Sequence, residues 1–195
     1  MNIAEIINYI FPYDGIYEVI VSTYGVSENI SPLGLIRDSD KFYFRLYSDT
    51  LTYFNLEKNP ECCIQVTNEP LYFYYTLFNK KINYEKIKGF LIIPNLTTIF
   101  SKCEIVDKNS EPRRILVRPS EVLGKNLCRA YNRGESLFID LLVHVTRLGI
   151  YSKEELEKYM KILDYEISVI ERTSPRLREV INELKKEVIS RFKSI

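Results

Sequence analysis

Short segments of alternating or continuous apolar character follow one another through the first two thirds of the chain, and this pattern predicts β-strands. Residues 16–24 (IYEVIVSTY) alternate apolar and polar positions in part, and residues 41–47 (KFYFRLY) are rich in aromatic side chains. A second strand is expected between them, with the sequence SPLG of residues 31–34 in its middle. The further candidates are residues 61–67, 89–93, 97–106 and 115–118. About six strands between Asp14 and Val117 fit a closed or partly open barrel better than a βαβ fold.

Two short helices are expected within this strand-rich region. Residues 52–58 form one candidate. Residues 71–78 (LYFYYTLF) are either a helix or a further strand, because eight residues do not decide between the two. Pro70 directly before them suits the first turn of a helix, so the helix is favoured.

The pattern becomes helical from about Gly134 onward. Apolar residues recur at helical spacing in three segments, and Ser152 to Glu155 fits a capping box before the second of them. Ser174 and Pro175 then supply a cap and an N1 proline for the third. The three stripes are Leu137, Leu141, Val145 and Leu148; Leu156, Met160, Leu163, Ile167 and Ile170; and Leu177, Ile181, Leu184 and Val188. We therefore expect a mainly β fold with α, divided into a barrel domain over residues 1–130 and a three-helix subdomain over residues 131–195.

Composition and charge narrow the function classes. Of 195 residues, 46% are hydrophobic, and 27 basic against 26 acidic residues leave a net charge of +1, so no chain-wide field favours nucleic acid or a membrane surface. No apolar run reaches the roughly 20 residues that span a bilayer, and the N-terminal residues lack a basic region, so a cytoplasmic protein is expected. The four cysteines form no C-x-x-C, which favours reduced, mostly buried thiols.

The corner between residues 41–47 and the helix expected at 52–58 is a candidate phosphate site. The hydroxyls of Ser48, Thr50 and Thr52 lie beside backbone N–H groups that a helix start leaves unpaired. The Asn55 amide adds a further donor. Arg45, on the same strand face as Tyr47, is the candidate balancing cation, whereas the charge of Asp49 opposes a phosphate. The alternative is that Ser48 or Asp49 is an ordinary N-cap and that the threonines are turn residues.

Two other segments leave the same choice open. Ser31, Pro32, Leu33 and Gly34 form either an edge strand with a bulge or a bulge that turns backbone groups toward a ligand. Asn68 either caps the helix after Pro70 or contacts a ligand. His144 is the only histidine and lies in an apolar helix, where a hydrogen-bonded structural role competes with ligand contact. One histidine, separated cysteines and no close carboxylate set indicate no metal site.

The ordered set GIYEVIVSTYG, SPLG, YSDTLTYFNL, VTNEP and NRGESLFIDLLVHVTRL resembles an uncharacterised family of FMN-binding split-barrel proteins, related to the flavin reductases and pyridoxamine-phosphate oxidases. The resemblance runs from about Gly15 to Arg147. It implies a six-stranded split barrel that forms a homodimer with FMN at the subunit interface. It also implies cofactor contacts at residues 30–34, at the YSDTLTYFN corner, at Asn68 and around His144. Leu51 departs from the basic residue expected between the two threonines.

The function that follows is an FMN-dependent oxidoreductase, in which a nicotinamide or another reduced donor passes hydride to the flavin and the flavin reduces a small acceptor. One alternative is a flavin-binding module without turnover that serves as a carrier, sensor or assembly partner. Another is a barrel without flavin, in which the aromatic residues are core. A deazaflavin in place of FMN also fits, since the corner reads the phosphate and not the ring.

Overall fold

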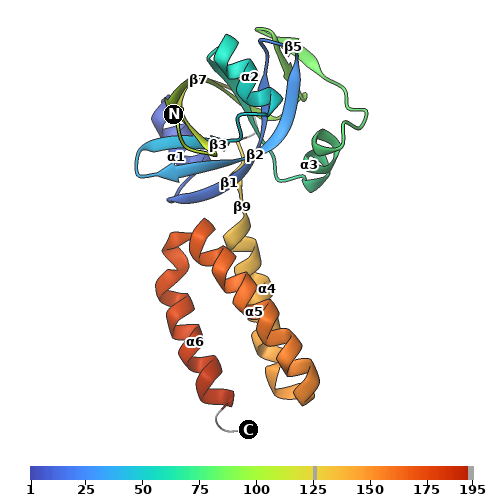
Figure 1. Ribbon diagram of the computed structural model, residues 1–195, viewed down its shortest axis with the longest axis vertical. Coiled ribbons are helices and arrows are strands. Elements are labelled where there is room, and N and C mark those ends of the chain that lie inside the picture. The colour runs from blue at the N-terminus through green and yellow to red at the C-terminus, as the bar shows by residue number, and fades with distance from the viewer. Residues whose placement is uncertain (125–126, 193–195) are drawn as a thin grey trace. The chain divides into compact units, whose positions relative to one another are not determined.

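The computed structural model describes residues 1–124 and 127–192, and the chain forms two compact units (Figure 1). Residues 1–12 and 17–131 make up the barrel unit, and residues 13–16 together with the chain from 132 onward make up the helical unit. The polypeptide therefore passes between the units at each end of the barrel sequence. Each unit has its own apolar core and is described by itself.

Six strands close the barrel in the order β1-β2-β3-β8-β7-β4, with β4 returning to β1. The pairs from β2 to β3, and on through β8, β7 and β4 to β1, are antiparallel. The β7–β8 pair shifts register twice, and such irregularities bend a strand and help a sheet to curve. The barrel strands are β1 (Gly15–Thr23), β2 (Asn29–Asp38), β3 (Lys41–Leu46), β4 (Glu61–Val66), β7 (Thr97–Asp107) and β8 (Arg113–Leu123). The predicted six-stranded barrel is confirmed.

The shorter elements complete the barrel unit. The helix preferred after Pro70 is confirmed as α3 (Pro70–Leu77), and the helix expected after the corner is α2 (Leu51–Lys58). Glu69, and not Asn68, caps α3, because its side chain accepts a hydrogen bond from the Leu71 N–H group. The sequence reading missed α1 (Ile3–Ile10), β5 (Glu85–Ile87) and β9 (Tyr131–Asn132), whereas β6 (Phe90–Ile92) was expected. β9 also pairs with β1.

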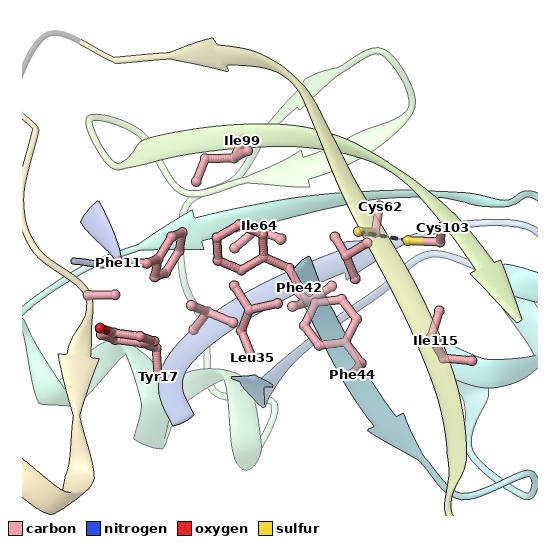
Figure 2. Packing of buried hydrophobic residues seen from close by; sticks show 14 of the residues in the cluster. Phe11, Tyr17, Leu35, Phe42, Phe44, Cys62, Ile64, Ile99, Cys103 and Ile115 are labelled. Atoms are coloured by element: carbon pink, nitrogen blue, oxygen red, sulfur yellow. Dashed lines mark hydrogen bonds between the residues drawn. The ribbon is translucent and has the colours of Figure 1, made fainter. Parts of the chain in front are cut away.

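The barrel core is aromatic and β-branched (Figure 2). Phe11 packs edge-on against Tyr17, with ring centroids 5.2 Å apart, so the residue after α1 inserts between strand side chains. The Sγ atoms of Cys62 on β4 and Cys103 on β7 lie 3.2 Å apart (Figure 2). All four cysteines are free and three are buried, as the spacing predicts. Burial raises the pKa of the Cys63 thiol to about 12, so this thiol stays protonated at neutral pH.

The outer face of β1 and β4 is covered as well, which explains why residues 16–24 alternate only in part. Ile20 packs outward with Ile30, Ile93 and the side chains of α3. Gln65 on β4 is fully buried, and its side chain accepts from the Ile93 N–H and donates to the Leu91 carbonyl. These two bonds fasten the segment around β6 to the barrel, because leaving a buried amide unpaired would cost about 1–3 kcal/mol.

Three helices form the helical unit, namely α4 (Arg133–Arg147), α5 (Lys153–Thr173) and α6 (Arg178–Phe192). Two 3₁₀ turns precede α5 and α6, at Leu148–Ile150 and Pro175–Leu177. Ser152 and Glu155 make the predicted capping box at the start of α5. All three predicted apolar stripes meet in one cluster around Leu141, Ile170 and Ile181. Among the described residues, no helix is long and apolar enough to cross a membrane.

Candidate functional site

A pocket of about 390 Å³ in the barrel unit joins three segments that are far apart in the sequence. The start of β2, the beginning of α2 and the end of α3 each contribute part of its wall. The volume lies in the range of small-molecule sites, about 300–1,000 Å³. Its lining consists of Asn29, Ile30, Ser31, Pro32, Leu33, Leu46, Thr50, Leu51, Thr52, Thr76, Leu77 and Asn79. The predicted SPLG segment and the predicted hydroxyl corner therefore lie on the same pocket.

A polar side-chain cluster links the first two walls. The Thr52 hydroxyl accepts a hydrogen bond from the Asn29 side-chain amide at 2.9 Å, and the Ser31 hydroxyl lies 3.4 Å from it. Thr52 is buried in spite of its position in the first turn of α2. Asn29 and Ser31 are two residues apart on β2, so their side chains share one strand face. The cluster holds β2 against α2 and gives one wall of the pocket a polar surface.

Thr50 is the N-cap of α2. Its hydroxyl accepts from the Tyr53 N–H at 3.3 Å and donates to the Tyr47 carbonyl at 2.8 Å. The sequence reading expected the cap at Ser48 or Asp49 and treated Thr50 as a turn residue, so that assignment was wrong. The N–H groups of Leu51 and Thr52 follow the cap, and the first N–H groups of a helix have no intrahelical acceptor. Both residues line the pocket, which brings the positive end of the α2 dipole to its wall.

The third wall comes from the end of α3. Asn79 has φ of 49°, and the Lys80 N–H donates to the Tyr75 carbonyl at 2.9 Å, which is the arrangement of a Schellman C-cap. This turn brings Asn79 to the pocket beside Thr76 and Leu77. The α3 aromatics lie elsewhere, since Tyr72 and Phe73 pack with Ile20 and Ile93.

Asn55 is fully buried and has a structural environment. Its side-chain oxygen accepts from the N–H groups of Val26 and Ser27, at 2.8 and 3.2 Å. Its amide nitrogen donates to the Ser27 carbonyl at 2.8 Å and to the Thr23 hydroxyl at 3.1 Å. Both amide hydrogens therefore have acceptors inside the protein, and Asn55 fixes the loop between β1 and β2.

The other residues of the predicted corner lie outside the pocket wall. Among the described residues, the lining does not include Arg45, Tyr47, Ser48 or Asp49, nor Gly34 on β2. Arg45 is exposed and pairs across the sheet with Arg114 of β8. The Ser48 N–H donates to a Glu111 carboxylate oxygen at 2.7 Å, and this bond lowers the pKa of Glu111. Asn68 is exposed in the turn before α3.

His144 belongs to the helical unit, where its Nδ1 lies 3.1 Å from a carboxylate oxygen of Glu166 on α5. This contact fits the hydrogen-bonded structural role that the sequence left open. A ligand atom of Asp140 also lies within 4.8 Å of both groups. The sequence expectation that no carboxylates gather near the histidine therefore does not hold.

Sequence reasoning missed several pocket residues. Asn29 carried a usable signal, because it lies two positions before Ser31 on a predicted strand and so shares its face. Thr76 and Asn79 carried none, since nothing local indicates that the end of α3 folds toward β2. The described part of the lining contains no lysine or arginine, so a bound phosphate would meet hydroxyls and helix N–H groups but no cation of this wall.

Comparison with known families gives two matches that together cover most of the chain. The profile described as "Protein of unknown function (DUF447) N-terminal domain" matches residues 17–124. The profile described as "Protein of unknown function (DUF447)" matches residues 132–186. No curated protein matches the chain.

Solved structures share the fold. An FMN-bound protein of Methanosarcina mazei, assigned to DUF447, superposes with a TM-score of 0.55 at 19% identity, over 86% of this chain and 91% of that one. The flavin reductase HpaC in complex with NADP⁺ follows at a TM-score of 0.49 and 15% identity, over 66% and 93%. An NADH:FAD oxidoreductase of Streptomyces globisporus gives 0.49 at 8% identity, over 60% and 78%.

Proposed function

The chain belongs to the DUF447 family, whose N-terminal profile spans residues 17–124, and we propose on this basis that it is an FMN-binding protein with its cofactor in the pocket between β2, α2 and α3. The observation that carries the proposal is the meeting of Ser31, Pro32 and Leu33 with Thr50 and Thr52 on one pocket of suitable volume. The FMN-bound relative of the same family and fold supports the choice of cofactor.

The phosphate end of the cofactor would lie at the start of α2. There the N–H groups of Leu51 and Thr52 supply donors, and the helix dipole favours an anion. The Thr52 hydroxyl adds a hydrogen bond, and charge-assisted bonds of this kind contribute about 1.5–3 kcal/mol each. Pro32, Leu33 and Leu77 offer apolar surface for the ring system. The cap bonds of Thr50 keep the first turn of α2 in the required geometry.

The remaining predicted contacts belong to the proposal in weaker form. Gly34, Arg45, Tyr47, Ser48, Asp49 and Asn68 would act at the rim, and Asn55 acts by fixing the neighbouring loop. The contact predicted for His144 stays a prediction of the resemblance. Residues 1–130 would form the cofactor-binding domain, and residues 131–195 the helical subdomain.

We propose that the protein forms a homodimer with FMN at the interface. The described pocket wall lacks a cation, so an arginine of a second subunit would balance the phosphate. Apolar side chains on α3 also stand exposed next to the pocket, which is typical of an interaction surface. These are Leu71, Tyr74, Leu77 and Phe78. A flavin-loaded monomer in sedimentation would contradict this part of the proposal.

The reaction class that we propose is oxidoreduction with a nicotinamide or similar reduced donor and a small acceptor. Bound FMN supplies the hydride and electron chemistry, while the chain binds it, orients it and excludes water. The position of the α3 aromatics favours turnover over a closed carrier, because Tyr72 and Phe73 pack toward Ile20 and Ile93 and do not line the pocket. A non-catalytic flavin module would bind FMN equally well but would not oxidise NADH or NADPH.

Replacing Thr52 by valine tests the site. The change keeps the shape of the side chain and removes the hydroxyl that faces Asn29 and Ser31, so we expect the Kd for FMN to rise about tenfold. Titration of flavin-free protein, followed by flavin fluorescence, measures the Kd.

The matched control is Thr98→Val. Thr98 is also a buried threonine of the barrel, but its hydroxyl bonds the Leu96 carbonyl and it lies on another pocket. We expect this variant to bind FMN like the unchanged protein. Equal FMN affinity in Thr52→Val and Thr98→Val would contradict the assigned site.

A further inference from the structure

The helical unit contains a cluster of three potential metal ligands that the proposed flavin site does not use. Asp140 and His144 lie four residues apart on α4 and so share one helix face. Glu166 comes from α5, which packs against α4. One ligand atom from each residue lies within 4.8 Å of the other two.

The surroundings of Glu166 make this cluster unusual for a surface. Glu166 is only 3% exposed, and burying a carboxylate is costly unless positive charge or hydrogen bonds compensate it. Its Oε2 meets His144 Nδ1 at 3.1 Å, which supplies one partner. Asp140 brings a second carboxylate to the same place, and like charges at this separation oppose each other. Two carboxylates therefore share one imidazole, and the group lacks positive charge.

Burial and the neighbouring Asp140 both raise the pKa of the Glu166 carboxyl, whereas His144 opposes this change. A carboxyl in this position gains from any positive charge that enters the cluster. A proton can supply that charge, and so can a cation.

We propose that Asp140, His144 and Glu166 bind a divalent transition-metal cation of the Zn²⁺ class. One imidazole and two carboxylates are ligands that this class accepts, with bonds of about 2.0–2.2 Å. Three atoms no more than 4.8 Å apart have a common point within about 2.8 Å of each, so small side-chain rotations would reach those bond lengths. Asp140 is exposed, which leaves the remaining coordination positions open to water.

The neighbouring side chains support a fixed imidazole. The Tyr159 ring lies 5.6 Å from the His144 ring and stacks on Tyr151, with centroids 4.1 Å apart. Binding of the cation would replace the proton between His144 Nδ1 and Glu166 Oε2, so the apparent affinity should rise with pH as the imidazole loses its proton. The cation would also join α4 to α5 and stabilise the helical unit. This inference does not depend on FMN.

Calorimetric titration of chelator-treated, reduced protein with Zn²⁺ tests the proposal. We expect equimolar binding, an upward shift of the melting temperature of about 5 °C or more at saturating metal, and weaker binding at pH 5.5 than at pH 7.5. Asp140→Asn should weaken binding by more than the ten- to hundredfold that loss of an outer-shell partner costs. Asp140 is exposed, so this variant should fold.

Two controls separate this site from adventitious binding. Asp164→Asn makes the same change at an exposed position of α5 outside the cluster, and it should bind Zn²⁺ like the unchanged protein. His144 is the only histidine, so the imidazole NMR signals of the unchanged protein report directly on ligation and should shift on addition of Zn²⁺. Unshifted imidazole signals, or equal Zn²⁺ affinity in Asp140→Asn and Asp164→Asn, would overturn the proposal.

Discussion

Asn55 combines complete burial with four hydrogen bonds, and it joins α2 to the loop between β1 and β2. Its neighbour Thr52 uses its hydroxyl toward β2 and the pocket. Two polar residues three positions apart on one short helix thus fix the two strands that carry the candidate flavin site. Any change at Asn55 acts on the barrel first and on ligand binding through it.

Replacing Asn55 by alanine should lower the free energy of unfolding by about 2–4 kcal/mol, because the N–H groups of Val26 and Ser27 lose a buried acceptor. Urea unfolding followed by tyrosine fluorescence measures this change. Asn109→Ala is the control, since Asn109 is exposed, and it should change stability by less than about 0.5 kcal/mol. A loss at Asn55 no larger than that at Asn109 would contradict the structural role.

Residue types at the corner were predictable from the sequence, but their division of labour was not. Hydroxyls before a helix indicate a cap, a phosphate site or both, and the sequence cannot say which one does which. The structure separates them, with Thr50 as the cap and Thr52 on the pocket wall. Ser48 instead donates its N–H to Glu111, a partner 63 positions away that no local pattern indicates.

At the scale of elements, local signals predicted most of the structure. The capping box at Ser152, the proline at the start of α3 and the three apolar stripes all have the predicted roles. The missed α1 had such a signal too, because Asn2 and Glu5 form a capping box. β5 is only three residues long, too short for any periodicity.

The capping box of α5 supports the helix that carries Glu166. Ser152→Ala removes the side-chain acceptor for the Glu155 N–H, so we expect a loss of about 1 kcal/mol in the stability of the helical unit. Far-ultraviolet circular dichroism during thermal unfolding measures it. Ser168→Ala on the same helix is the control, because the Ser168 hydroxyl only bonds the Tyr165 carbonyl within the helix. A stable Ser152→Ala together with a destabilised Ser168→Ala would contradict the cap assignment.

At the scale of the whole molecule, the pattern of strands predicted a barrel but not which strands pair. Closure brings β4 to β1 and β8 to β3, across separations that no local pattern records. The pocket is a product of this closure, since its wall combines residues 29–33, 46–52 and 76–79. The resemblance to FMN-binding barrels supplied the cofactor, and the fold supplied the place where the predicted segments meet.

The visible absorption spectrum of the purified protein, with mass analysis of the small molecule released on denaturation, tests the central claim most directly. The account predicts a flavin spectrum and release of FMN, or, if the protein is isolated without cofactor, uptake of an equimolar amount of added FMN. A colourless protein that takes up no FMN would contradict it, as would release of a deazaflavin in place of FMN.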